Sequence, residues 1–131
     1  MPLEPLLPSG EMTDDAYVLA IDLGTSGPKV GLVASSGAVL GAEFEPVELL
    51  LLPDGGAEQD PGVWWQAICS ATRRLVDKRI VPPAEIAADT VTSQWSGTVA
   101  LDSSGDAIGN AVIWMDSRGA PHIRQLISVP V

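Results

Sequence analysis

Residues 17–33 constrain the fold of this chain more than any other segment. They read Tyr-Val-Leu-Ala-Ile-Asp-Leu-Gly-Thr-Ser-Gly-Pro-Lys-Val-Gly-Leu-Val, with two apolar runs around a short polar stretch. Runs rich in Val, Ile and Leu on either side of glycine and hydroxyl residues are typical of two β-strands joined by a turn. The sequence therefore predicts a β-hairpin near the amino end, against which later elements pack.

The polar stretch has the chemical groups that a magnesium-phosphate site needs. Asp22 stands at the predicted strand end, and its carboxylate is the hard oxygen ligand that Mg²⁺ prefers while it keeps part of its hydration shell. Glycines let backbone N–H groups approach phosphate oxygens, and hydroxyl or ammonium groups donate to the same charge. The candidate phosphate-binding residues are Gly24, Thr25, Ser26, Gly27 and Lys29.

A plainer interpretation of the same residues stays open at this level. Glycine and serine between two apolar strands are ordinary in a hairpin turn, and Asp22 could hydrogen-bond its own turn. The spacing is neither that of a Walker loop nor that of G-x-G-x-x-G. The hypothesis of nucleotide binding therefore depends on the rest of the chain.

Length and charge exclude several classes of protein. The 131 residues suit one domain, and the net charge of -10 argues against a protein that binds a nucleic-acid backbone or an anionic membrane. Cys69 is the single cysteine, which excludes an internal disulfide and fits a reducing cytoplasm. Residues 1–15 hold no basic residue and lack the features of a signal peptide, so we expect a disordered tail there.

The remaining segments predict an α/β domain with a mixed sheet. We expect a third strand at residues 39–51, which completes an antiparallel meander, and then a helix that Asp60 caps and Pro61 begins. Apolar residues recur along this helix at a helical period, at Trp64, Ile68, Ala71 and Leu75. A strand at residues 90–95 follows the helix and can lie parallel to the first strand. A small hairpin at 98–114 and a helix at 116–127 complete the prediction.

Four motifs in this order resemble the amino-terminal part of FGGY-family carbohydrate kinases of the xylulokinase-like kind. They are residues 21–29, residues 58–61 with Trp64 and Trp65, residues 93–97, and residues 112–118. The resemblance runs from about residue 17 to residue 120, and it assigns residues 16–131 to a partial amino-terminal kinase domain. It implies a ribonuclease H-like fold of the actin and sugar-kinase superfamily.

The resemblance also implies the chemistry. Such kinases use ATP and Mg²⁺ to phosphorylate a small sugar or polyol. The loop at Asp22 faces the phosphates, so Asp22 takes the catalytic and metal-binding role, and Gly24, Thr25, Ser26 and Lys29 bind the nucleotide. The resemblance places the catalytic base and the adenosine site beyond Val131, so we expect the 131-residue chain to be inactive alone. It leaves a homodimer of the full-length enzyme open.

The predicted sugar pocket departs from the family pattern. Xylulokinases read Gly-Gln-Met-His-Gly where this chain has residues 93–97, and here Trp95 and Ser96 replace the Met-His pair. We expect Gln94, Trp95 and Ser96 to line the substrate pocket, although Trp95 could instead pack in the core at a strand end. Asp116 and Arg118 match the family's Trp-x-Asp-x-Arg pattern, and they either pair with each other or orient the pocket.

Two other functions remain open from the sequence. The chain could be a non-catalytic kinase remnant or a module that binds a sugar or nucleotide. It could also be another ATPase of the actin-like superfamily, against which the Trp-x-Asp-x-Arg motif and residues 58–61 argue.

Overall fold

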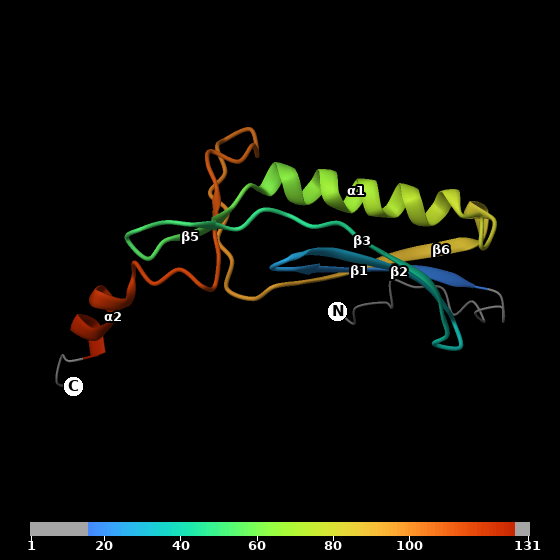
Figure 1. The fold of residues 1–131 in the computed structure, drawn as a ribbon, viewed down its shortest axis with the longest axis horizontal. Coiled ribbons are helices and arrows are strands. Elements are labelled where there is room, and N and C mark those ends of the chain that lie inside the picture. The colour runs from blue at the N-terminus through green and yellow to red at the C-terminus, as the bar shows by residue number, and fades with distance from the viewer. Residues whose placement is uncertain (1–15, 128–131) are drawn as a thin grey trace, which may run out of the picture.

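The structure is a computed structural model that describes residues 16–127, without the side chains of residues 124–126. The tail predicted at residues 1–15 lies outside this range. A four-stranded mixed sheet forms the centre, in the order β3-β2-β1-β6. The long helix α1 covers one face of this sheet (Figure 1). The expected α/β class with a mixed sheet is confirmed.

The amino-terminal hairpin forms as the sequence predicts. Strands β1 (Tyr17–Gly24) and β2 (Gly27–Ala34) pair antiparallel, and Asp22 lies opposite Lys29 in the register. Strand β6 (Ile86–Ser93) then adds to β1 in parallel, as expected for a strand that follows a helix. It begins four residues earlier than predicted, because a 3₁₀ turn at Pro83–Glu85 leads directly into Ile86, which packs on the core.

The third strand is shorter than predicted. Strand β3 covers Val39–Phe44, and its regular pairing with β2 ends before Pro46, which has no N–H to donate. The chain still follows the hairpin, because Glu45 N donates to Pro28 O at 3.1 Å and Val47 N donates to Ser26 O at 3.0 Å. The prediction of one strand over 39–51 is therefore wrong in its second half.

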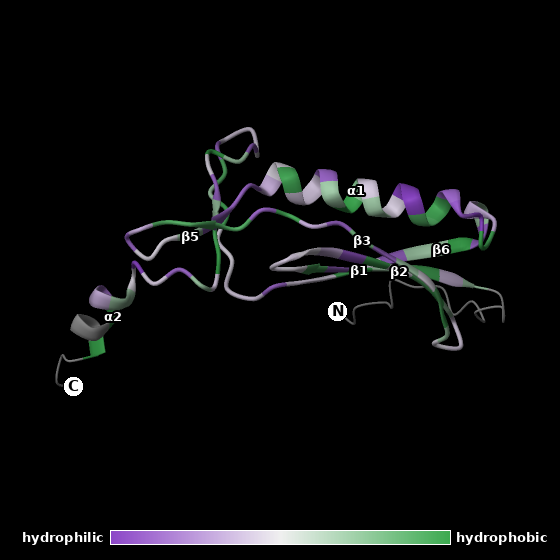
Figure 2. Ribbon diagram, viewed as in Figure 1, coloured by the Kyte–Doolittle hydropathy of each residue, from purple (hydrophilic) through white to green (hydrophobic). Residues whose placement is uncertain are grey.

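Helix α1 (Pro61–Asp77) begins as predicted. Asp60 caps it by accepting a hydrogen bond from the backbone N–H of Gly62, and Pro61 occupies the first turn, where its missing N–H costs nothing. Its own residues Ala67, Ala71 and Leu75 are buried. Apolar and polar residues alternate along α1 in Figure 2, as a helix with one covered face requires.

The alternation of side chains along a strand gives the central sheet two different faces. Val30 and Leu32 of β2 point to the helix and form the core with α1, and Leu19 and Ile21 of β1 pack against them. Asp22 alternates with Ile21 and so belongs to the opposite face. The core therefore fixes which face of the sheet presents Asp22.

A second, smaller sheet lies beside the first. Its order is β4-β5-β7, with β4 at Leu50–Leu51, β5 at Ala57–Gln59 and β7 at Ala111–Val112. The hairpin predicted at 98–114 forms in part, through isolated bridges between Thr98 and Val112 and between Leu101 and Ala107, while β7 pairs with β5 along its other edge. Helix α2 (Ala120–Ile127) begins four residues later than predicted. Within residues 16–127, no helix is long and apolar enough to cross a membrane.

Candidate functional site

The face of the central sheet opposite α1 presents the predicted phosphate-binding residues. Asp22 and Lys29 lie opposite each other in the register of β1 and β2, and both are exposed. They line a hollow of about 300 Å³ whose other polar residues are Thr90 and Thr92 of β6. Neither Asp22 nor Lys29 forms an ion pair with any residue in the described part of the chain. Both charges are therefore available to a ligand.

Asp22 alone is too few ligands for a magnesium ion, which would also need phosphate oxygens of a bound substrate. Within residues 16–127, no three His, Cys, Asp or Glu side chains gather closely enough to hold a metal ion. A single exposed carboxylate suits Mg²⁺, which is often held by one or two carboxylates together with water and substrate phosphates. The residues present therefore fit Mg²⁺ that arrives with a phosphate.

One chain of side-chain hydrogen bonds links the four sequence motifs. Trp114 Nε1 donates to Thr25 Oγ1 at 2.9 Å, and Thr25 Oγ1 donates to Gln94 Oε1 at 3.0 Å. Gln94 Nε2 then donates to Gln59 Oε1 at 2.9 Å, and Gln59 Nε2 donates to Thr25 O at 2.8 Å and to Glu48 O at 3.2 Å. We call this set, Trp114, Thr25, Gln94 and Gln59, the relay.

The relay shows that two predicted site residues, Thr25 and Gln94, are in direct contact. Thr25, predicted to bind the nucleotide, and Gln94, predicted to line the sugar pocket, are hydrogen-bonded to each other. The backbone joins them too, since Gln94 N donates to Leu23 O at 2.8 Å. Sequence reasoning assigned no function to Gln59 or Trp114. Only the structure shows that Gln59 is in phase with the buried Ala57 on β5 and therefore points inward.

Trp95 and Ser96 form an exposed turn after β6. Trp95 is 73% exposed, so the alternative that it packs in the core is wrong. Ser96 has a φ of 53°, in the left-handed region that few residues other than glycine adopt. Strain of this kind gathers at ligand-binding sites, and here it accompanies the indole that the turn presents to solvent.

The two glycines of the first loop have different reasons to be glycine. A Cβ on Gly24 would lie 3.5 Å from Gly27 O, an ordinary contact, so the chain itself does not require glycine there. Gly27 has a φ of +139°, and a Cβ there would lie 1.9 Å from Glu45 O. Residues 45 and 46 pass so close to Gly27 that no side chain fits there, which explains why this position is glycine. The approach of a ligand remains the proposed reason for Gly24.

Replacing Gly27 by alanine should destabilise the hairpin. The substitution combines a strained backbone with a clash against Glu45, and we expect a loss of about 2 kcal/mol or more in the free energy of unfolding. Denaturant unfolding of the two proteins measures this. Gly37→Ala is a useful comparison, because Gly37 also has a positive φ of +87° but has no atom within 4 Å of an added Cβ. Equal losses in both variants would contradict the clash.

A cluster of ionised side chains joins the last motif to β5. Arg118 pairs with Asp116 at 2.6 Å and with Glu58 at 2.7 Å, and Asp116 also accepts a hydrogen bond from the backbone of Ala57 at 3.0 Å. The Arg118 guanidinium, then the Ala57 N–H, lower the pKa of Asp116 to about 2, and Arg118 with Asn110 lowers the pKa of Glu58. These partners support the interpretation that Asp116 and Arg118 pair with each other.

The cluster should make stability depend on pH in the acid range. The pKa of Asp116 is below its ordinary value of 3.8 in the folded chain, so the folded state binds the proton less readily than the unfolded state. Its contribution to stability is complete above the ordinary pKa and is lost as pH falls toward about 2. Urea unfolding at a series of pH values should show this loss in the parent and a smaller one in Arg118→Met.

Arg73→Met provides the control for that comparison, because Arg73 is exposed and forms no ion pair within the described residues. Arg118→Met should also be less stable than the parent at neutral pH, where Asp116 and Glu58 would repel each other without a cation. An unchanged acid profile in Arg118→Met would contradict the role of this cluster.

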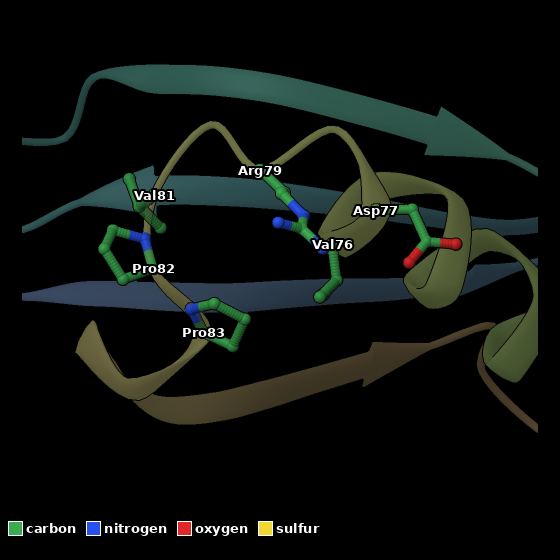
Figure 3. A pocket seen from close by; sticks show the side chains of 6 residues that line it. All are labelled: Val76, Asp77, Arg79, Val81, Pro82 and Pro83. Carbon is green, nitrogen blue, oxygen red and sulfur yellow. The ribbon is translucent and has the colours of Figure 1, made fainter.

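A larger cavity lies away from these residues. It measures about 490 Å³ and is lined by Val76, Asp77, Arg79, Val81, Pro82 and Pro83, at the carboxyl end of α1 (Figure 3). Ile86, three residues after Pro83, pairs with Tyr17 at the start of β1, whereas Asp22 lies near the end of that strand. This cavity therefore takes no part in the candidate site.

Comparison with known proteins assigns the arrangement to a family. The amino-terminal domain model of the FGGY family of carbohydrate kinases matches residues 17–129, which include both β1 and the Trp-x-Asp-x-Arg motif. The chain belongs to this family. The resemblance that the four motifs suggested is thereby confirmed.

Curated relatives include two kinds of kinase. The chain is 34% identical over 105 residues to the xylulose kinase of Bacillus subtilis, and the match covers 80% of this chain and 21% of that protein. It is 31% identical over 113 residues to the glycerol kinase of Corynebacterium efficiens, covering 86% and 22% of the two chains. The FGGY-family chain described here spans about a fifth of the length of these relatives.

Solved structures confirm the fold. A xyloylose kinase from Brucella ovis matches with a TM-score of 0.75 at 28% identity, over 84% of this chain and 23% of the other. The gluconate kinase of Lactobacillus acidophilus matches with a TM-score of 0.79 at 23% identity, over 86% and 22%. The chain therefore has the ribonuclease H-like fold of the actin and sugar-kinase superfamily, in the form of a partial amino-terminal domain.

Proposed function

We propose that this chain is one wall of the active site of an ATP-dependent carbohydrate kinase, which transfers a phosphoryl group to a hydroxyl of a small sugar or polyol. The observation that supports it is the exposed Asp22 opposite Lys29, without an ion pair among residues 16–127, on the open face of the sheet where the first and third motifs meet. Phosphoryl transfer depends mainly on alignment and charge neutralisation, and these two residues offer both signs of charge to one ligand.

Four of the residues predicted for the phosphate side have a direct role in this proposal. Asp22 holds Mg²⁺ or its water ligands, Lys29 donates to the phosphates, and the backbone around Gly24 and Ser26 lies against them. Bound Mg²⁺ supplies neutralisation of the charge on the phosphates. The glycerol kinase of Plasmodium falciparum, solved with ADP, shares the fold with a TM-score of 0.72, and this supports ATP as the phosphoryl donor here.

The acceptor is proposed to be a pentulose, a related polyol or another small polyhydroxy compound. Relatives are named for xylulose, glycerol and gluconate, so the family accommodates several such acceptors. Trp95 presents a flat apolar face that can stack on the carbon chain of a sugar, and Ser96 adds a short donor and acceptor. Since neither residue matches the Met-His pair of xylulokinases, D-xylulose need not be the preferred acceptor.

The setting of the enzyme is also a proposal. The acidic chain and its single, half-buried cysteine fit a cytoplasmic enzyme whose partners are small molecules rather than nucleic acid or membrane. We leave a homodimer of the full-length enzyme as part of the same proposal.

A screen of acceptors tests the function. We define the carrier kinase as a full-length family member whose amino-terminal segment is residues 17–129 of this chain. Supplied with Mg²⁺ and ATP, it should phosphorylate at least one member of a panel of pentuloses, hexonates and polyols. Trp95→Met should change the ranking of acceptors, by about tenfold in kcat/KM for the best one, because the stacking face is lost. Phosphorylation of D-xylulose alone, unaffected by Trp95→Met, would contradict the proposed pocket, and no transfer to any acceptor would contradict the function.

A further inference from the structure

Gln59 occupies an unusual position for a polar side chain. It lies on β5 with 1% of its surface exposed, and it is the one buried polar side chain found within residues 16–127. Its Nε2 reaches two backbone carbonyl oxygens, those of Thr25 and Glu48. A carbonyl oxygen only accepts hydrogen bonds, so the amide nitrogen of Gln59 must face this pair. Its Oε1 is thereby directed at Gln94 as an acceptor.

The direction of the hydrogen bonds is also fixed at the other end of the relay. The indole nitrogen of Trp114 can only donate, and it lies 2.9 Å from Thr25 Oγ1. The hydroxyl of Thr25 must therefore accept from Trp114 and give its single proton to Gln94 Oε1, 3.0 Å away. Reversing either amide would place acceptor against acceptor or donor against donor. The relay thus has one direction, from Trp114 to the carbonyl groups that Gln59 contacts.

This direction decides what Thr25 can offer to a phosphate. Its hydroxyl proton is committed to Gln94, so its side chain is not a free donor in the first loop. We infer that Gln59 is a positioning residue for phosphoryl transfer: it fixes the direction of the relay and holds the Thr25 loop against the turn that presents Trp95. This inference rests on the proposed kinase function and adds a residue that acts through Thr25 and Gln94.

Gln59 holds the loop at two points. It contacts the carbonyl of Thr25 directly at 2.8 Å, and through Gln94 it also fixes the hydroxyl of the same residue. Gln94 in turn precedes the strained turn at Trp95 and Ser96. The buried amide of Gln59 therefore fixes the distance between the phosphate side and the proposed sugar side of the site. Displacements of about 1 Å in such a site can lower turnover by up to about a hundredfold.

Gln59→Glu in the carrier kinase tests the inference. An ionised carboxylate cannot donate to the two carbonyl groups, so the loop should shift. We expect kcat to fall roughly 10- to 100-fold, while KM for ATP and for the acceptor stays within about twofold. Gln66→Glu is the matched control, because Gln66 is exposed on α1 and has no side-chain hydrogen bond in the described part of the chain. This control should leave both constants unchanged.

The pH dependence of kcat in Gln59→Glu separates a positioning role from general destabilisation. A buried carboxyl group facing carbonyl oxygens has a raised pKa, and its protonation restores one donor. The ratio of kcat in Gln59→Glu to kcat in the parent should therefore increase as pH is lowered from about 8 to about 6. The same ratio for Gln66→Glu should stay flat.

A double-mutant cycle with Thr25→Val tests whether the two residues act as a unit. Thr25→Val removes the hydroxyl that both Trp114 and Gln94 contact. If the relay positions the loop, the double variant should lose little more kcat than the worse single variant, because the same arrangement is already broken. Multiplicative losses in kcat would overturn the inference, since they would mean that Thr25 and Gln59 act separately.

The remaining outcomes also decide the question. Gln59→Leu is a second variant, since leucine has neither the donor nor the acceptor of the amide. An active carrier kinase in which both Gln59→Glu and Gln59→Leu keep the parent kcat would overturn the positioning role and leave the kinase function intact. If neither Gln59 variant folds, the residue is structural and the positioning role is wrong. A parent carrier kinase that transfers phosphate to no acceptor would overturn the proposed function and this inference with it.

Discussion

Replacing Asp22 by asparagine is expected to lower the turnover of the carrier kinase by about a hundredfold or more. The amide has the shape of the carboxylate but no negative charge, so it binds Mg²⁺ or its water ligands far more weakly. Charge neutralisation by a metal contributes several kcal/mol to a transition state, and each 1.4 kcal/mol corresponds to about tenfold in rate. The KM of the acceptor should change by less than about threefold, because Asp22 belongs to the open sheet face rather than to the turn at Trp95.

Asp89→Asn is the matched control for this experiment. Asp89 is an exposed aspartate of β6, but it lines the groove between α1 and the sheet, on the face opposite Asp22. The same chemical change there should leave turnover as it is in the parent. Steady-state kinetics at saturating and limiting Mg²⁺ would separate loss of metal affinity from loss of the chemical step. Parent-like turnover in Asp22→Asn would remove Asp22 from the mechanism.

Local signals made the hairpin and the main helix predictable. The apolar runs around Asp22 are strands because their residue types favour strands and the segment between them can turn. Asp60 and Pro61 mark the start of α1 through capping chemistry that involves only adjacent residues. The parallel placement of β6 followed from the connection through a helix. In each case the deciding interaction lies within a few residues or follows from chain handedness.

The relay and the second sheet could not be predicted from local sequence signals. Thr25 and Gln94 are 69 positions apart, and Gln59 reaches both only because β5 lies beside the hairpin end. The predicted hairpin at 98–114 forms only as two bridges, and the pairing of Ala111 and Val112 with β5, more than 50 positions earlier in the chain, was not predicted. A pairing between distant strands depends on how the whole domain packs, which periodicity does not report.

The 131-residue chain alone is expected to transfer no phosphate to a sugar at a rate above background. Transfer requires a base or orienting group at the attacking hydroxyl and a nucleotide held in line on the other side of the phosphate. In the proposed function Asp22 and Lys29 form only one wall of the active site, and both are exposed. Charges in water interact several-fold more weakly than charges in an enclosed site, because water screens them. A closed site therefore needs a second wall, which in relatives about five times as long can come from the rest of the polypeptide.

Purified chain, supplied with Mg²⁺, ATP and the same acceptor panel, tests this expectation when sugar phosphate is measured directly. The carrier kinase serves as the positive control, and a matched Asp22→Asn preparation of the chain sets the background. Turnover by the chain above that background would mean that Asp22, Lys29 and the relay complete an active site without a second wall. In that case the open face of the sheet must close by another route, such as pairing of two chains, and sedimentation of the active preparation would distinguish a dimer from a monomer.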